Sequence, residues 1–205
     1  MLEIACFNAS SAVAAAKAGA NRIELCADYT GGGTTPTEET LRHVRLETAI
    51  PINVMMKSAI QLLKPAASGF VFGILDEQHR VDLKKNRALV DLAAPLPCTF
   101  HRAFDQVPDL FEAVVQIIAC AFTSILTSGG PADAVVGAGV VEALQESFGN
   151  DLTFILGGGV RSTNIEALKR QTKVHWYHSA AITTPGEDVD EQEVCRLQNI
   201  LQGNL

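Results

Sequence analysis

The segment from Thr99 to Asp105 places three side chains that could do chemistry within a few positions. It contains an imidazole (His101), a guanidinium (Arg102) and a carboxylate (Asp105). Such a set can bind an anion and transfer a proton. In the alternative interpretation, His101 is a core histidine held by Asp105, and Arg102 pairs with a neighbouring loop.

Other polar or reactive side chains lie at or just after the ends of short apolar runs elsewhere in the chain. They are Glu24, Cys26, Asn53, Lys57, Thr127, Ser128, His178 and Ser179. We predict that Glu24 joins His101, Arg102 and Asp105 in catalysis. The remaining residues, apart from Cys26, are predicted to bind substrate. Their shared position favours function over chance, because barrel active sites are built at the carboxyl ends of strands.

A glycine triplet, Gly157, Gly158 and Gly159, follows the seventh apolar run and precedes an expected helix. Backbone amides there, together with the helix N-terminus, could bind a phosphate or an oxyanion. A tight turn in which a Cβ atom would clash explains the triplet equally well.

Cys6 and Cys26 end the first two apolar runs. If these runs are neighbouring strands, two thiolates could approach a soft ion such as Cu(I). Side-chain alternation opposes the pairing, because Cys26 shares a face with Glu24, whereas Cys6 points away from the barrel if Glu3 points into it. Free cysteines are also commonly ordinary buried residues.

The fold expected to position these side chains is a single (β/α)₈ TIM barrel over residues 1–205. Short β-branched runs alternate with helical stretches such as Ser10 to Ala18 and Asp109 to Cys120, as in a closed parallel barrel. The predicted strands are Leu2–Cys6, Arg22–Cys26, Ile52–Met56, Gly69–Ile74, Cys98–Ala103, Ser124–Ser128, Leu152–Leu156 and Val174–Ser179.

The third unit of this barrel is expected to be abbreviated. Between Met56 and Gly69 the chain must descend outside the barrel and return, and a helix from Ser58 to Ser68 leaves almost no loop.

Composition excludes several classes of function. The net charge of -7 disfavours nucleic acid or an anionic membrane as partner. No apolar run approaches the roughly 18 residues of a membrane span, and Met1-Leu2-Glu3 is unlike a signal peptide, so we expect a cytoplasmic protein. Five scattered cysteines without a CxxC pair predict reduced thiols.

In its motifs the chain resembles the CutC family. The resemblance begins with Leu2-Glu3-Ile4-Ala5-Cys6, Gly19-Ala20-Asn21-Arg22-Ile23-Glu24-Leu25-Cys26 and Gly32-Gly33-Thr34-Thr35-Pro36. It continues in order through Asn53-Val54-Met55, Phe72-Gly73-Ile74-Leu75, Thr99-Phe100-His101-Arg102-Ala103-Phe104-Asp105, Leu126-Thr127-Ser128-Gly129-Gly130, Gly157-Gly158-Gly159-Val160 with Asn164, and His178-Ser179-Ala180.

The resemblance implies a cytoplasmic, oligomeric TIM barrel involved in copper homeostasis, with Cu(I) bound by Cys6 and Cys26. The chain departs from the family after Met55, where an arginine-rich loop and a longer helix are usual, and at Ser124, where an arginine is common. Either the chain has lost this loop or a mobile segment is absent from this sequence, and in both cases one cationic wall expected of the family pocket is not represented in it.

Two functions follow from these observations. The first is a copper homeostasis protein that binds Cu(I). The alternative is a TIM-barrel enzyme that acts on a small anionic or phosphorylated metabolite, with Glu24 or His101 transferring a proton and Arg102 and Lys57 binding the anion. The barrel fold by itself does not decide between them.

Overall fold

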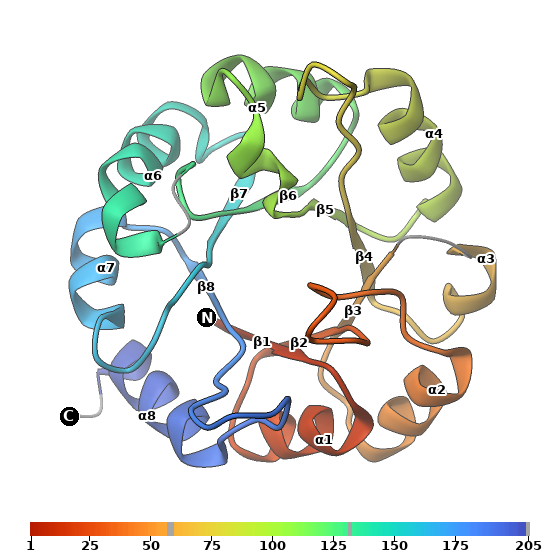
Figure 1. The fold of residues 1–205 in the computed structure, drawn as a ribbon, viewed down its shortest axis with the longest axis vertical. Helices are drawn as coiled ribbons and strands as arrows, with labels where there is room; N and C mark the ends of the chain where they lie inside the picture. Colours follow the sequence, from red (N-terminus) through yellow and green to blue (C-terminus); the bar gives the residue numbers. More distant parts are fainter. Residues whose placement is uncertain (57–59, 131–132, 204–205) are drawn as a thin grey trace.

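Parallel strands form a closed barrel surrounded by helices (Figure 1). The structure is a computed structural model that describes residues 1–56, 60–130 and 133–203. The strands are β1 (Leu2–Cys6), β2 (Arg22–Leu25), β3 (Ile52–Met55), β4 (Gly69–Phe72), β5 (Cys98–Phe100), β6 (Ser124–Thr127), β7 (Thr153–Leu156) and β8 (Trp176–Ser179). They pair in chain order, and β1 closes the barrel against β8.

The helices form the outer ring. They are α1 (Ala9–Lys17), α2 (Glu38–Glu47), α3 (Ile60–Leu63), α4 (Leu83–Ala93), α5 (Leu110–Ala119), α6 (Ala134–Phe148), α7 (Ile165–Thr172) and α8 (Glu191–Gln202), with a 3₁₀ helix η1 (Arg102–Gln106) at the barrel mouth. Side-chain caps define several starts, as where Asp109 accepts hydrogen bonds from the amides of Phe111 and Glu112. The predicted TIM barrel is confirmed.

The predicted abbreviation of the third unit is also confirmed. Helix α3 has only four residues, far fewer than the 15 residues of α6. Residues 57–59, and with them the predicted helix start at Ser58 and the candidate Lys57, lie outside the described residues.

One predicted boundary was wrong in a way that affects the site. Strand β5 ends at Phe100 instead of continuing to Ala103, and η1 follows it directly. The His101 ring caps η1, because its Nδ1 accepts a hydrogen bond from the Ala103 amide. This local turn competes with the strand and carries Arg102 and Asp105 over the mouth.

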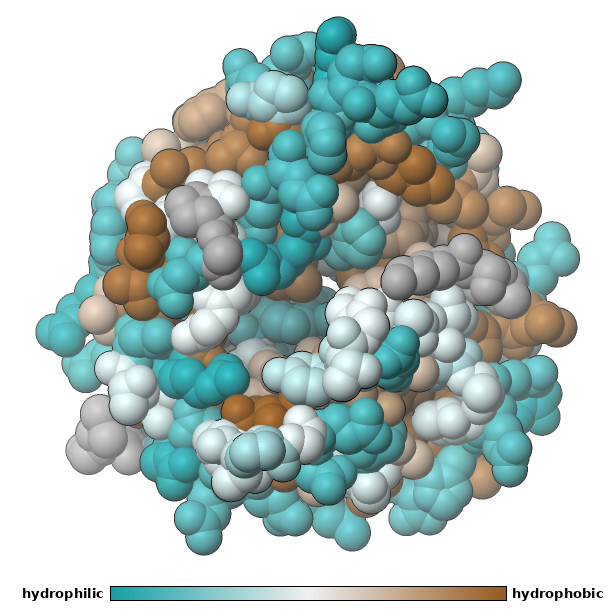
Figure 2. All heavy atoms as spheres, viewed as in Figure 1, coloured by the Kyte–Doolittle hydropathy of each residue, from teal (hydrophilic) through white to brown (hydrophobic). Residues whose placement is uncertain are grey.

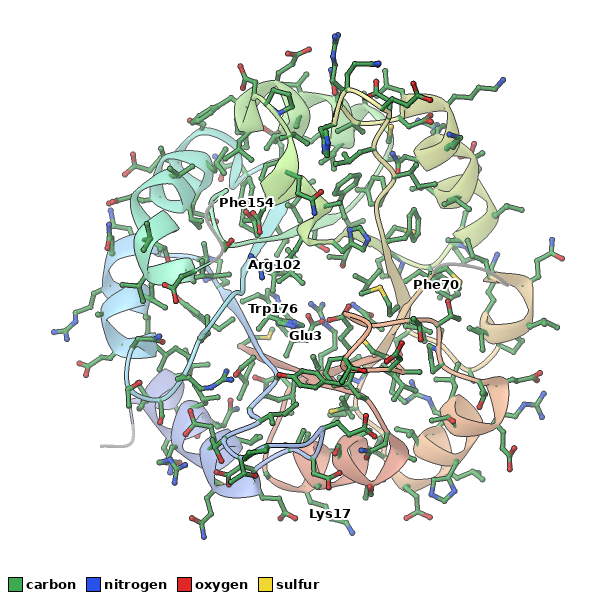
Figure 3. The ribbon with its side chains drawn as sticks, viewed as in Figure 1. Glu3, Lys17, Phe70, Arg102, Phe154 and Trp176 are labelled. Atoms are coloured by element: carbon green, nitrogen blue, oxygen red, sulfur yellow. The ribbon has the colours of Figure 1, made fainter. Side chains whose placement is uncertain are left out.

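Buried charged and polar side chains lie inside the barrel, whereas the layer between strands and helices is apolar. Large side chains such as Phe70, Phe72 and Phe154 are fully buried in the apolar core, and Figure 3 shows Phe70 and Phe154 at the barrel wall. Glu3 and Glu24, one position away from apolar neighbours on their strands, are also buried. The two-residue period of a strand places these two sets on opposite faces.

None of the helices in the described part of the chain is both long and apolar enough to cross a bilayer.

Two glycines of α6 give a matched test of how closely this helix packs. A Cβ atom on Gly137 would lie 1.7 Å from the Ser128 carbonyl oxygen, whereas one on Gly139 would meet nothing nearer than 3.9 Å. We expect Gly137→Ala to destabilise the fold by about 1–3 kcal/mol and Gly139→Ala to stabilise it by up to about 1 kcal/mol. Urea unfolding checks both values, and equal stabilities would contradict this packing.

Candidate functional site

A buried group of charged side chains spans the first, second and last strands inside the barrel. Glu3 of β1 lies in register with Arg22 of β2 on one side and with His178 of β8 on the other. Its carboxylate accepts hydrogen bonds from Arg22 Nε at 2.5 Å and from His178 Nδ1 at 2.8 Å. The Arg22 guanidinium also stacks on the Trp176 ring, 3.9 Å from the centroid. Figure 3 shows Glu3 and Trp176 near the barrel axis.

The second carboxylate of this group, Glu24, is only partly satisfied. His178 Nε2 lies 3.5 Å from Glu24 Oε2. The other oxygen, Oε1, is buried and has no hydrogen-bond partner among the described residues. An unsatisfied buried carboxylate is costly, so the site favours a protonated carboxyl or a ligand that donates a hydrogen bond.

The environment shifts the pKa values of the two carboxyl groups in opposite directions. Burial raises the pKa of Glu24 to about 7, against the charge of His178, and the nearby Glu3 carboxylate adds to the rise. Burial would also raise the pKa of Glu3, but the hydrogen bond from His178 and the charge of Arg22 outweigh it and lower that pKa. Glu3 therefore stays ionised, whereas Glu24 can exchange a proton near neutral pH.

The pKa of His178 is raised as well. Burial opposes the charged imidazolium, but the hydrogen bond to Glu3 and the charge of Glu24 outweigh burial. Because Nδ1 is committed to Glu3, the Nε2 atom is the one directed to Glu24. Glu3 thus orients the imidazole, in the way that a buried carboxylate orients a catalytic histidine.

A cavity of about 590 Å³ opens above this group at the carboxyl ends of the strands. Its wall consists of Ala5, Phe7, Glu24, Cys26, Gly32, Gly33, Met55, His101, Arg102, Ala103, Asp105, Gln106, Leu126, Gly130 and His178. Figure 2 shows the opening at the centre of the mouth. Of the residues predicted from sequence, the cavity brings together Glu24, Cys26, His101, Arg102, Asp105 and His178.

Asp105 is a tightly held part of the cavity rim. Its carboxylate accepts hydrogen bonds from Arg102 Nε, Thr127 Oγ1, the Ser128 amide and hydroxyl, and the Gly130 amide. Arg102 also donates to the Ser128 hydroxyl through Nη2. Neither Thr127 nor Ser128 lines the cavity, and both instead anchor η1 to the end of β6.

Five further candidates, Asn53, Gly157, Gly158, Gly159 and Ser179, lie outside the cavity lining. Asn53 is buried in β3, in register with Glu24. The Gly157 amide donates to the Thr127 carbonyl, and the Gly158 carbonyl accepts from the Ala134 amide. The Ser179 hydroxyl donates to the Val160 carbonyl.

Gly158 and Gly159 have φ values of 100° and 79°, so the turn itself accounts for these two glycines.

The side chains of Cys6 and Cys26 do not share the cavity. The Cys26 amide donates to the Cys6 carbonyl at 2.8 Å, so the two backbones are adjacent. Cys26 lines the cavity, whereas Cys6 does not, and the Cys6 thiol lies against the Ile4 carbonyl. Burial raises the pKa of both thiols, and the charge of Glu24 raises both further. These surroundings disfavour the thiolates that bind Cu(I).

Glu3, Glu24 and His178 also form a group that could hold a metal ion, with one ligand atom from each within 4.8 Å of the others. Two carboxylates and one imidazole suit a harder divalent ion better than Cu(I), which prefers sulfur. Glu3 is already paired with Arg22, so the donor set is only partly free.

Glu3, Arg22 and Trp176 belong to the site but were not among the residues predicted from sequence. Their signal was present, because Glu3 is a charged residue inside an apolar strand and Arg22 alternates with Glu24 along the next one. That Glu3 and Trp176 lie beside Arg22 follows from the barrel register.

The match to a known family covers most of the chain. The model of the CutC family matches residues 1–61 and 55–183. The two segments meet at the abbreviated third unit. A family protein CutC of Xanthomonas campestris pv. campestris (strain B100) is 33% identical over 233 residues, which cover 98% of this chain and 97% of the relative. This aligned length exceeds the 205 residues of the chain, so the relative has residues that this chain lacks.

Named relatives and solved structures extend the comparison. The human copper homeostasis protein cutC homolog is 33% identical, over 90% of this chain and 74% of the relative. The structure of the putative copper homeostasis protein CutC from Streptococcus agalactiae has a TM-score of 0.80 and 25% identity, over 88% of this chain and 98% of that one.

Thiamine phosphate pyrophosphorylase from Pyrococcus furiosus has a TM-score of 0.73 and 17% identity, over 100% of this chain and 96% of that one. At this identity the likeness concerns the fold alone. The matches that cover most of the chain show family membership. The chain belongs to the CutC family and is a homologue of proteins named for copper homeostasis.

Proposed function

We propose that the chain binds a small polar metabolite at the barrel mouth and that Glu24 and His178 transfer a proton to or from it. The observation that carries the proposal is the Glu24 carboxyl, which is buried at the cavity, has an unpaired oxygen among the described residues and has a pKa of about 7. A general acid or base works best when its pKa lies near the operating pH.

The surrounding side chains have distinct roles in this proposal. Glu3 holds His178 through Nδ1, which leaves Nε2 to share a proton with Glu24. Arg22 keeps Glu3 ionised from the opposite side. A proton that Glu24 takes from the ligand is then stabilised in a site that already favours the neutral carboxyl.

An anionic part of the ligand would lie at the rim, beside Arg102. This side chain is 39% exposed and its guanidinium is held in place by Asp105 and Ser128. A positioned guanidinium suits a phosphate or a carboxylate. The ligand we propose therefore has an anionic group near Arg102 and an acidic C–H or O–H group near Glu24.

Cu(I) binding is the second candidate function. One observation favours it: Cys26 lines the cavity next to the backbone of Cys6, in a family whose relatives are named for copper homeostasis. A cytoplasmic location, which would keep the thiols reduced, is part of this proposal. The position of the Cys6 side chain and the raised thiol pKa values weaken it.

The proton-transfer proposal predicts exchange of ligand protons with solvent. Phosphorylated and carboxylated small metabolites, incubated with the protein in D₂O, should include at least one that gains deuterium at carbon by NMR. Glu24→Gln should slow this exchange about 100-fold or more, because a positioned acid or base contributes that much. Glu47→Gln, an exposed change on α2, serves as the control.

The direction in which the exchange rate changes with pH tests whether Glu24 acts as the base. If Glu24 acts as the base, exchange should rise with pH and level off above about pH 7, where the carboxylate is formed. Exchange that is independent of Glu24, or flat between pH 5 and 8, would rule out this role.

The copper proposal predicts a different result in an anaerobic Cu(I) titration against a competing chelator. Stoichiometric binding that is lost in Cys26→Ser and largely kept in Cys6→Ser would support a site built on the cavity-lining thiol. Weak binding that neither substitution changes would eliminate Cu(I) as the ligand.

A further inference from the structure

We infer that the ligand of this barrel is amphiphilic, with a polar head in the mouth cavity and an apolar tail in a groove between α3 and α4. The inference rests on the proposed function, because it takes the head to lie at Glu24 and His178. It adds the chemical class of the ligand, which the polar mouth does not by itself define.

The groove is a second cavity of about 550 Å³ with a mainly apolar wall. Its lining is Met56, Ile60, Gln61, Leu62, Phe72, Gly73, Ile74, Leu89, Leu92 and His101. Two of these side chains are exposed, Leu62 at 63% and Leu92 at 46%. Figure 2 shows hydrophobic surface between the central opening and the region of α4. An apolar surface of this kind marks a binding site or a contact.

The groove and the mouth cavity share a wall. His101 lines both of them. Successive residues at the end of β3 divide between the two, because Met55 lines the mouth cavity and Met56 lines the groove. Gly73 packs tightly in this wall, since a Cβ atom there would lie 2.7 Å from the Phe100 ring and 3.0 Å from His101 Nδ1. The route from one cavity to the other therefore runs over the His101 side chain, and a molecule that lies across this side chain contacts both cavities.

The abbreviated third unit accounts for the opening. Helix α3 covers this side of the barrel with only four residues, Ile60–Leu63. The family match is divided at residues 55–61, and the Xanthomonas relative aligns over more residues than this chain has. The extra residues of relatives would fall where this groove lies. In this chain the apolar wall is left to a ligand tail, which continues from the mouth cavity, the site of the proposed chemistry.

The contribution of an apolar tail to binding affinity can be measured with two diols that have the same polar head. The 1,2-octanediol molecule carries five more methylene groups than 1,2-propanediol, and each fully buried methylene should tighten binding about fourfold. Because the groove is half open, we expect octanediol to bind at least about thirtyfold more tightly. NMR of ¹³C-labelled methyl groups should show shifts at Leu62, Leu89 and Leu92, and both diols should shift the His178 ring.

Charged substitutions in the groove test where the tail lies. Leu92→Glu and, independently, Leu62→Glu should reduce the advantage of octanediol to less than about threefold while leaving propanediol binding unchanged. Leu46→Glu is the matched control, because Leu46 lies on α2 away from the groove and is 87% exposed. Thermal unfolding of each variant confirms that it is folded.

Three results would overturn the inference. The first is equal affinity for the two diols, and the second is octanediol shifts in the groove without a shift of the His178 ring. The third is a dimer that Leu92→Glu dissociates, measured by light scattering, which would assign the groove to a second copy of the chain. Failure of the proposed function is separate, because it appears as deuterium exchange that does not depend on Glu24.

Discussion

Burial of the Glu3 carboxylate is the constraint on which the site depends. A carboxylate removed from water must be paired, and Glu3 is paired twice, with Arg22 of the next strand and with His178 of the strand that closes the barrel. These contacts connect β1, β2 and β8 inside the barrel. The hydrogen bond with Glu3 also occupies the Nδ1 atom of His178, so that Nε2 faces Glu24. The pKa of Glu24 is raised mainly by the burial of Glu24 itself, while the charge of His178 opposes the rise and the charge of Glu3 adds to it.

The same arrangement explains why the interior of this barrel can be polar without loss of the fold. The apolar core lies outside the strands, under the helices, where Phe70, Phe72 and Phe154 are fully buried. The interior is therefore free to carry charged and polar side chains that serve a ligand. The short helix α3 leaves a groove in the outer layer, and this groove adjoins the mouth through His101.

Membership of the CutC family and the geometry of the site bear on different questions. The family connects the chain to copper homeostasis proteins of other organisms. The geometry shows two thiols in surroundings that oppose ionisation, with only Cys26 at the cavity, and a carboxyl–imidazole pair directly below it. A soft metal ion binds the two thiols only if their thiolates form, whereas the pKa of about 7 allows Glu24 to gain or lose a proton near neutral pH.

The sequence by itself determined the barrel, the order of its strands and the short third unit. The periodicity of apolar residues is a local property that identifies strands and helices, and the number of residues between two strands limits the length of the helix that can connect them. It also located six of the residues that line the mouth, since strand ends of a barrel converge on one face. The early end of β5 was missed, because the cap that His101 places on η1 competes with strand continuation through a contact between side chain and backbone.

Only the tertiary structure decided which side chains meet. Glu3 and His178 are 175 positions apart, and their contact exists because β1 pairs with β8 in one particular register. The way in which β1, β2 and β8 meet also leaves Glu24 with an unpaired oxygen among the described residues. Register and closure depend on packing of the whole barrel, so the partners of a residue, and with them its pKa, are not encoded in the local sequence around it.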